Sequence, residues 1–249
     1  MDLKNKACLI TGGTKGIGAA TAIAFAERGA NIAIVAREID DEAKQTARSV
    51  EALGVKCLMF SADVAKPDQA TGCVERTARE LGSVDVLVHS AGGPVPGSIL
   101  EITPEKWFAA FDVHIHAIYF LCRAALPMMQ KKKEGAVILV SSSAGKRGIV
   151  GNTCYQTVKG TLPQMARALA RDFANDNIRI NVVAPGVIRT RFHDSMTEQT
   201  RRNNLDNRIP LHREGNCEQV ATVIRELATN DYITGETVSV DGGLTMRIA

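Results

Sequence analysis

The amino-acid sequence predicts an α/β fold in which helices flank both faces of one doubly wound, parallel sheet of about seven strands. Short apolar runs alternate along the chain with longer amphipathic stretches. The short runs are apolar at nearly every position, as expected for strands that are buried on both faces of a parallel sheet. A glycine-rich turn follows the first run, and this position favours an open, three-layer αβα sandwich over a closed barrel.

Seven runs predict strands, at residues 7–10, 32–35, 55–60, 84–88, 136–140, 178–183 and 237–240. Helices are expected between them, at residues 16–28, 40–53, 67–81, 103–133, 153–174 and 217–228. Gly29 and Gly54 end the first two helices, and Pro67 suits the first turn of the third. The stretch from about 190 to 213 is polar and has no strand pattern, so we expect an insertion that covers the substrate. Residues 1–249 are therefore expected to form a single domain.

Length and composition are those of an ordinary globular protein. The 249 residues are 45% hydrophobic and 23% charged, and a domain of this size can bury a large core. The formal net charge of +3, from 30 basic and 27 acidic side chains, is too balanced to predict a nucleic-acid partner.

The cysteines predict free thiols in a reducing cytosol. None of the six stands in a CxxC spacing, so neither a metal site nor a redox pair is expected. The first apolar run stops after a few residues at Thr11-Gly12, unlike a signal peptide. No run approaches the ~20 apolar residues of a membrane span. These observations predict a soluble, cytoplasmic protein with no membrane partner.

The turn after the first strand has the features of a phosphate-binding loop. Its glycines let the chain turn tightly, and the helix that follows points its free N–H groups at an anion. A strand before the turn and a helix after it favour a dinucleotide over a plain turn. The predicted cofactor-binding residues of this segment are Gly12, Thr14, Lys15, Gly16, Ile17 and Gly18.

The end of the second strand predicts which dinucleotide is bound. A carboxylate at this place accepts hydrogen bonds from the adenosine ribose and repels a 2′-phosphate, whereas a basic residue does the reverse. Here the strand ends in Ala36 and Arg37, and Lys15 lies within the glycine turn. Two cations and no acid at this place predict that the cofactor is NADP(H). The alternative is that both cations are solvated surface charges.

The hydroxyl of Ser142, the phenol of Tyr155 and the ammonium group of Lys159 predict proton exchange with a substrate oxygen. Tyr155 and Lys159 are four residues apart near the start of a predicted helix and so share one face. A nearby cation lowers the pKa of a phenol from its usual ~10 and lets it exchange a proton with a substrate oxygen. Ser142 ends the fifth strand, at the rim where ligands bind in open α/β sheets.

These motifs together resemble the short-chain dehydrogenase/reductase family, a group with a Rossmann fold, over nearly the whole chain. The GxxxGxG turn and the Ser…YxxxK set carry the resemblance, which implies that Ser142, Tyr155 and Lys159 are catalytic. It also implies that Lys159 contacts the nicotinamide ribose and that Tyr155 is a further cofactor-binding residue. By the same resemblance, further cofactor contacts are Asp63, Val64, Ser90, Ala91, Gly92, Pro185, Gly186, Val187, Ile188 and Thr190. Family members are usually homotetramers or homodimers, so we expect one of these assemblies.

The chain departs from the family pattern at two places. Ser90 stands where most members have Asn, and His114 stands where most have an Asn that supports a water relay to the lysine. His114 is therefore a fourth candidate catalytic residue. An imidazole that titrates near neutrality would add a proton path; the alternative is a neutral ring in a packed helix.

The resemblance implies an NADP(H)-dependent oxidoreductase that moves a hydride between nicotinamide and a small-molecule carbonyl or secondary alcohol. Three substrate classes stay open: a 3-oxoacyl thioester, a sugar or polyol, and a steroid-like or xenobiotic ketone. The covering segment mixes apolar residues such as Phe192 and His193 with several arginines, and that mixture names no ligand. A catalytically weak NADP(H)-binding regulatory or sensor protein is the alternative function.

Overall fold

Seven parallel strands form one sheet, as the sequence predicts. The structure is a computed structural model, and it describes residues 1–190 and 196–246. The strand order is β3-β2-β1-β4-β5-β6-β7, and every neighbouring pair is parallel. The strands are β1 (Ala7–Thr11), β2 (Asn31–Ala36), β3 (Cys57–Ser61), β4 (Val86–His89), β5 (Gly135–Val140), β6 (Ile178–Pro185) and β7 (Thr237–Val240).

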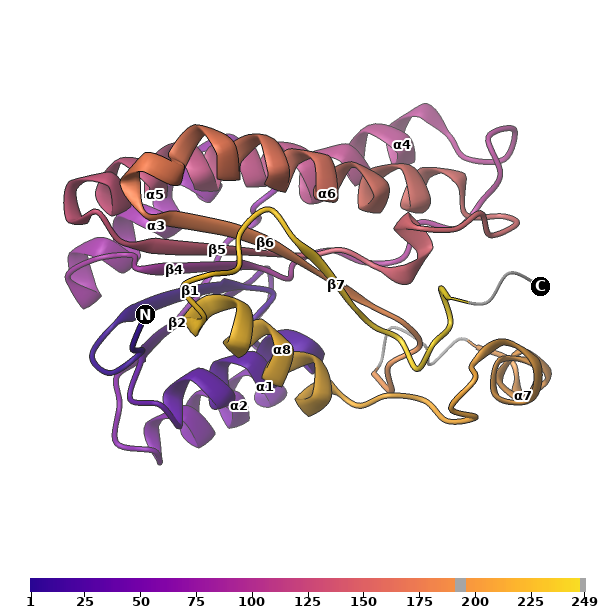
Figure 1. Cartoon of the computed structure of the whole chain (residues 1–249), viewed down its shortest axis with the longest axis horizontal. Helices are drawn as coiled ribbons and strands as arrows, with labels where there is room; N and C mark the ends of the chain where they lie inside the picture. The colour runs from indigo at the N-terminus through magenta and orange to yellow at the C-terminus, as the bar shows by residue number, and fades with distance from the viewer. Residues whose placement is uncertain (191–195, 247–249) are drawn as a thin grey trace.

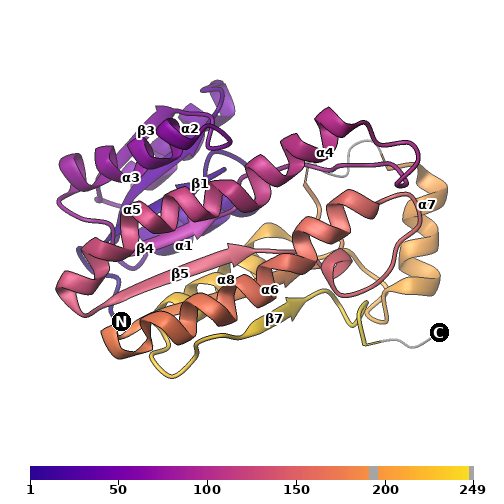
Figure 2. The same ribbon diagram turned by 90° about the horizontal axis from the view of Figure 1, so that it is seen from above.

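Helices cover both faces of the sheet, which gives the predicted three-layer, doubly wound sandwich. Figures 1 and 2 show one layer of α3, α4, α5 and α6 and, across the sheet, a second layer of α1, α2 and α8. The bounds are α1 (Gly16–Ala26), α2 (Asp41–Glu51), α3 (Pro67–Leu81), α4 (Pro104–Phe111), α5 (Ala117–Lys132), α6 (Thr153–Phe173), α7 (Glu198–Asn203) and α8 (Cys217–Thr229).

Alternate residues of each strand pack into the two halves of the core. On β1, Leu9 packs with side chains of the α3, α5 and α6 layer, whereas Cys8 and Ile10 pack with those of α1 and α8. All five residues of β1 are buried. This two-sided burial explains the nearly continuous apolar runs from which the strands were predicted.

The reversal in strand order positions a ligand site. The chain runs from β1 to β2 and β3 on one side, then returns to place β4 on the other side of β1. In open parallel sheets, ligands bind at the carboxyl ends of the strands where the order reverses in this way. Figure 1 shows α7 beyond this rim of the sheet and the N-terminus at the opposite rim.

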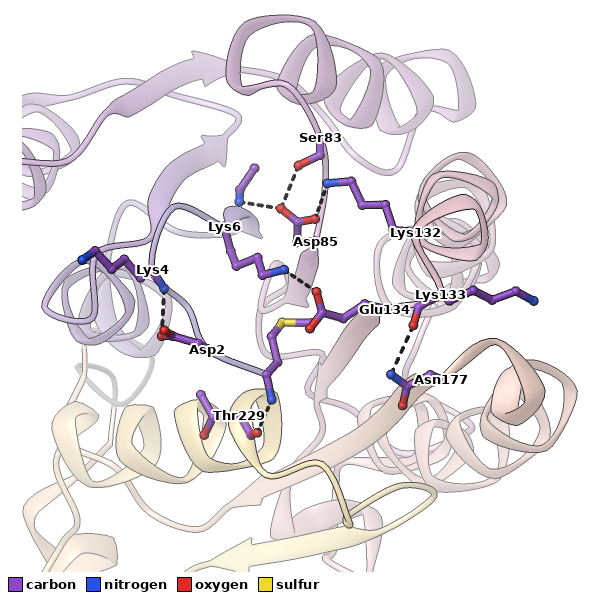
Figure 3. Close-up of polar contacts among 12 residues, drawn as sticks. Asp2, Lys4, Lys6, Ser83, Asp85, Lys132, Lys133, Glu134, Asn177 and Thr229 are labelled. Carbon is purple, nitrogen blue, oxygen red and sulfur yellow. Dashed lines mark hydrogen bonds and ion pairs between the residues drawn. The ribbon is translucent and has the colours of Figure 1, made fainter.

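A polar cluster closes the opposite rim (Figure 3). The side chain of Asp85 is 4% exposed and accepts hydrogen bonds from Lys132 Nζ at 2.6 Å, from Ser83 Oγ at 2.7 Å and from the backbone N–H of Ala7 at 2.9 Å. Burial raises the pKa of this carboxyl, but the hydrogen bonds outweigh burial and hold the pKa below its usual value. Asp85 thus ties the starts of β1 and β4 to α5, away from the candidate site.

The predicted helix at 103–133 is interrupted. Between α4 and α5, residues Asp112–His116 form one turn of π-helix, which places His114 at the centre of the interruption. Single π-turns of this kind occur often at functional sites. The stretch Pro104–Lys132 is long and apolar enough to cross a membrane, by length and composition alone. Its residues Ile118, Leu121 and Met129 are fully buried against the sheet, so it is a core helix.

The described part of the predicted covering segment is partly helical. It has the short helix α7 and a turn of π-helix at Asn204–Arg208. Residues 191–195, among them Phe192 and His193, lie outside the described residues.

Candidate active site

The glycine turn joins β1 to the N-terminus of α1 at the sheet's carboxyl rim. Gly12 and Gly16 have positive φ values of 66° and 54°, which glycine adopts without strain. A Cβ on Gly12 would lie 2.8 Å from Ala91 N, and a Cβ on Gly18 would overlap Gly12 O. Packing within the chain therefore requires these two glycines. Among residues 1–190 and 196–246, a Cβ on Gly16 would meet only Thr190 within 4 Å, at 3.5 Å, so Gly16 leaves space in which a phosphate could approach the backbone.

The N-terminus of α1 fits an anionic group. Lys15 precedes the helix in an extended conformation, and no described side chain caps the first turn. The first N–H groups of the helix are therefore available to a pyrophosphate, as in other dinucleotide sites. The residues present thus fit the predicted dinucleotide at its phosphates.

Two other predicted segments, residues 90–92 and 185–190, converge on this turn. Ser90 N–H donates to Thr11 O at 3.1 Å, which holds the end of β4 beside the end of β1. Thr190, the last of the predicted cofactor contacts, lies beside Gly16. Gly186 packs against Asp241, where a Cβ would lie 2.7 Å from the aspartate Cα, and Ile188 is buried. These contacts are all within the chain, so the cofactor contacts predicted for Ser90, Ala91, Gly92, Pro185, Gly186, Val187, Ile188 and Thr190 stay predictions.

The predicted cofactor contact at Asp63 and Val64 has a local structural role as well. The Asp63 carboxylate accepts a hydrogen bond from Ala65 N–H at 3.1 Å, and Asp63 N–H donates to Gln69 Oε1 at 2.6 Å. The Val64 side chain is buried in the core. The cofactor contacts of Asp63 and Val64 both stay predictions.

The two predicted phosphate-binding cations differ in their surroundings. Arg37 is exposed at the end of β2. Lys15 instead forms an ion pair with Asp40, and Glu42 Oε2 lies 3.9 Å from Lys15 Nζ. The sequence prediction took no account of these two carboxylates.

Ser142, Tyr155 and Lys159 lie together at the end of β5 and the start of α6, as predicted. The Lys159 Nζ lies 5.8 Å from the centre of the Tyr155 ring, and Ser142 hydrogen-bonds the Tyr155 side chain. The Ser142 Oγ also accepts a hydrogen bond from Ala144 N–H at 3.1 Å. Ser142 is thus the N-cap of the short 3-10 turn after β5, and this bond holds its hydroxyl in place.

The pKa values of this pair differ from the prediction. Burial raises the pKa of Tyr155 to about 12, against the opposing effect of the hydrogen bond from Ser142. Burial also lowers the pKa of Lys159 to about 7. The expected lowering of the phenol pKa is wrong for this arrangement, because the ammonium group donates to Val140 O at 2.8 Å and both side chains are desolvated. Tyr155 is therefore a protonated acid at neutral pH.

The His114 side chain lies beside Tyr155. Its ring meets the Tyr155 ring edge-on, with 6.0 Å between centroids, and its Nε2 lies 3.2 Å from Gly93 O. Burial and then the charge of Lys159 lower its pKa to about 2. A ring with this pKa stays neutral at physiological pH, so the neutral packed ring fits the structure and a titrating imidazole does not. A Cβ on Gly92 would overlap this ring, so Gly92 makes the room that His114 occupies.

A second buried histidine was missed in the sequence. His89 ends β4, and its ring nitrogens lie 2.9 Å from Thr11 Oγ1 and 3.0 Å from Val113 O. It therefore bridges β1 to the π-turn that carries His114. Burial and then the charge of Lys159 lower its pKa to about 3. The available signal was a polar residue at the end of an otherwise apolar strand.

Ser141 hydrogen-bonds the backbone carbonyl of Lys159, which Pro163 leaves without a helical donor. Within a helix, the N–H of residue 163 would pair with the carbonyl of residue 159, but proline has no N–H. Ser141 Oγ donates to that Lys159 carbonyl at 2.7 Å, and Ser141 is 4% exposed. Gly145 lets the loop approach, since its Cβ would lie 2.7 Å from Lys159 C. α6 is thus tied to the end of β5 at Lys159.

This arrangement predicts a rescue. Ser141→Ala should lower the free energy of unfolding by about 1–3 kcal/mol, because it leaves a buried carbonyl without a donor. Adding Pro163→Ala should recover much of the loss, because the alanine that replaces proline supplies the N–H that the carbonyl lacks. Chemical denaturation of the two single variants and the double variant measures this coupling. Equal instability of Ser141→Ala and the double variant would contradict it.

Comparison with known proteins agrees with this geometry. A family model described as enoyl-(acyl carrier protein) reductase matches residues 12–245. The chain is 35% identical to the 3-oxoacyl-[acyl-carrier-protein] reductase FabG of Chlamydia muridarum over 246 residues, which cover 97% of this chain and 98% of the relative. It is also 35% identical to the FabG of Thermotoga maritima over 249 residues, 99% and 100% of the two chains.

A solved structure shows the same fold. A short-chain type dehydrogenase/reductase from Mycobacterium marinum superposes with a TM-score of 0.92 at 31% identity, over 99% of this chain and 98% of that one. The fold and the site define an oxidoreductase of the nicotinamide-dependent kind. The chain belongs to the short-chain dehydrogenase/reductase family.

Proposed function

We propose that this chain is an NADP(H)-dependent reductase that converts a carbonyl group into a secondary alcohol. The observation that carries the proposal is the convergence of Ser142, Tyr155 and Lys159 at the rim where the strand order reverses. The dinucleotide, when bound, supplies the hydride. The chain supplies the proton and the groups that orient the carbonyl.

Each side chain of the set has a distinct task. The Ser142 hydroxyl donates to the carbonyl oxygen and holds it near the phenol. Tyr155 gives its proton to that oxygen as negative charge develops there, which suits a phenol that is protonated at neutral pH. In its charged form, Lys159 stabilises the phenolate that remains, and His114 packs against the Tyr155 ring and fixes its orientation.

The relatives favour one substrate class. Two of them are named as 3-oxoacyl-[acyl-carrier-protein] reductases and align over almost their full length. We therefore propose a 3-oxoacyl thioester as the first substrate to test. The experiment is NADPH oxidation, followed by the loss of nicotinamide absorbance, with a 3-oxoacyl thioester, a sugar-derived ketone and a steroid-like ketone. Tight NADPH binding with no oxidation of NADPH by any of them would favour the weak sensor protein instead.

Arg37 is proposed as a phosphate-binding residue, and its substitution predicts a change of cofactor. Arg37→Asp should raise the KM for NADPH by roughly tenfold or more and lower the KM for NADH, because a carboxylate repels the 2′-phosphate and accepts from the ribose hydroxyl. Steady-state kinetics with both cofactors check this. Unchanged kinetics with NADPH would remove Arg37 from the site.

We also propose a homotetramer or homodimer. Large apolar side chains are exposed on and before the long helices, with Leu100 94%, Phe108 63% and Tyr119 49% exposed. An assembly through α4 and α5 would bury the apolar side chains that these helices expose. Light scattering of the purified protein measures the assembly, and a monomer would contradict the proposal.

A further inference from the structure

We infer that Asp40 limits how strongly this chain prefers a 2′-phosphorylated dinucleotide, because its carboxylate neutralises one of the two cations available to the phosphate. This inference rests on the proposed function and concerns the same site. The juxtaposition that carries it is the ion pair between Lys15 in the glycine turn and Asp40 before α2.

The Asp40 carboxylate is fixed in place. Asp40 is the N-cap of α2, and its Oδ1 accepts from Ala43 N–H at 3.0 Å while its Oδ2 accepts from Lys15 Nζ. The helix itself is tied to the glycine turn, because Thr46 Oγ1 donates to Thr14 O at 2.9 Å inside the core. A phosphate that draws Lys15 toward itself must therefore pull it away from a carboxylate that stays where the cap holds it.

The charges around the adenosine end are balanced rather than basic. Arg37 and Lys15 are the two predicted phosphate-binding cations, and Glu38, Asp40 and Glu42 are carboxylates on the segment after β2. A 2′-phosphate bound by Lys15 lies within the repulsive field of Asp40 as well. Ala36 contributes no charge, so the last position of β2 neither adds to this repulsion nor offsets it.

The expected change in phosphate affinity depends on how exposed these charged side chains are. The side chains of Lys15, Asp40 and Glu42 are 38%, 40% and 37% exposed, so water and salt screen their interactions in part. Removing one carboxylate charge should therefore change phosphate affinity by a factor of roughly three to ten at low ionic strength. The factor should shrink as salt is added.

Asp40→Asn tests the inference without disturbing the helix, because Asn caps as well as Asp. Direct titration of the full-length protein with NADPH and with NADH, followed by nicotinamide fluorescence, gives both Kd values without a ketone substrate. We expect NADPH to bind about three- to tenfold more tightly, with the Kd for NADH changed less than about twofold. In a Lys15→Met background, Asp40→Asn should have no such effect.

Asp41→Asn is the matched control. It removes the same charge one residue along, but the Asp41 side chain is 96% exposed and pairs with Lys44. Equal effects of Asp40→Asn and Asp41→Asn, an unchanged Kd for NADPH in Asp40→Asn, or the same gain without Lys15 would overturn the inference and leave the proposed function standing. Failure of the unaltered protein to bind either dinucleotide would overturn both.

Discussion

Tyr155→Phe is expected to lower kcat for carbonyl reduction by roughly 10²–10⁴, the usual contribution of a positioned proton donor. The substitution removes the only atom of this side chain that can donate, and leaves the ring that packs edge-on against His114. A phenol with a pKa of about 12 is fully protonated at pH 7, so the unaltered protein presents the acid form to the carbonyl oxygen.

The Kd for NADPH separates this effect from a binding defect. It should rise by a few-fold at most in Tyr155→Phe, roughly the loss of one hydrogen bond to the cofactor, since the proposed phosphate contacts lie at the glycine turn. Ser142→Ala should also lower kcat, because the hydroxyl that orients the carbonyl is lost. A Tyr155→Phe variant that retained more than about a tenth of the activity would show that another group donates the proton.

The second large effect is a loss of stability in mild acid. His89 and His114 are each 1% exposed, and burial lowers their pKa values to about 3 and about 2. Both are neutral in the folded protein, but they bind protons near pH 6.5 when the chain unfolds. Their full contribution to stability is therefore present above pH 6.5 and declines as the pH falls below it. Each histidine should remove about 1.4 kcal/mol of unfolding free energy per pH unit between about pH 6 and pH 5.

Urea denaturation at pH 7, 6 and 5 measures this slope. His114→Asn should remove about half of it while keeping activity within several-fold, because an amide can also donate to Gly93 O. His116→Asn is the control, since His116 lies on the same π-turn but its side chain is 56% exposed. A slope that His114→Asn left unchanged would mean that the ring is already protonated in the fold, or that another group controls the acid response.

The three layers could be predicted from the sequence, because burial on both faces of the sheet produces continuous apolar runs. The rim that carries the site could be predicted as well, because parallel strands all end at the same edge of the sheet. For that reason Ser142 and Tyr155, which are thirteen residues apart, could be placed together from their positions alone. The π-turn around His114 was not predicted. One extra residue in a helical turn barely alters the apolar pattern of a long helix.

The remaining differences are contacts between segments far apart in the chain. The ion pair of Lys15 with Asp40 and the hydrogen bond of Ser141 to Lys159 depend on how loops and helices pack, and no local pattern encodes the first of them. The signal for the second was present in Pro163, four residues after Lys159, because a proline there leaves the lysine carbonyl in need of a donor. The pKa values of Tyr155 and Lys159 depend on burial, and their spacing in the sequence does not reveal it.

The most direct test of hydride transfer to a carbonyl follows the transferred atom. The purified protein would be given a 3-oxoacyl thioester and NADPH that carries deuterium at the transferable C4 position, and the product would be examined by mass spectrometry. We predict a 3-hydroxyacyl product with one deuterium on the new carbinol carbon, formed by the unaltered protein and only in trace amounts by Tyr155→Phe. An alcohol without deuterium, or equal product from both proteins, would contradict the proposed reaction.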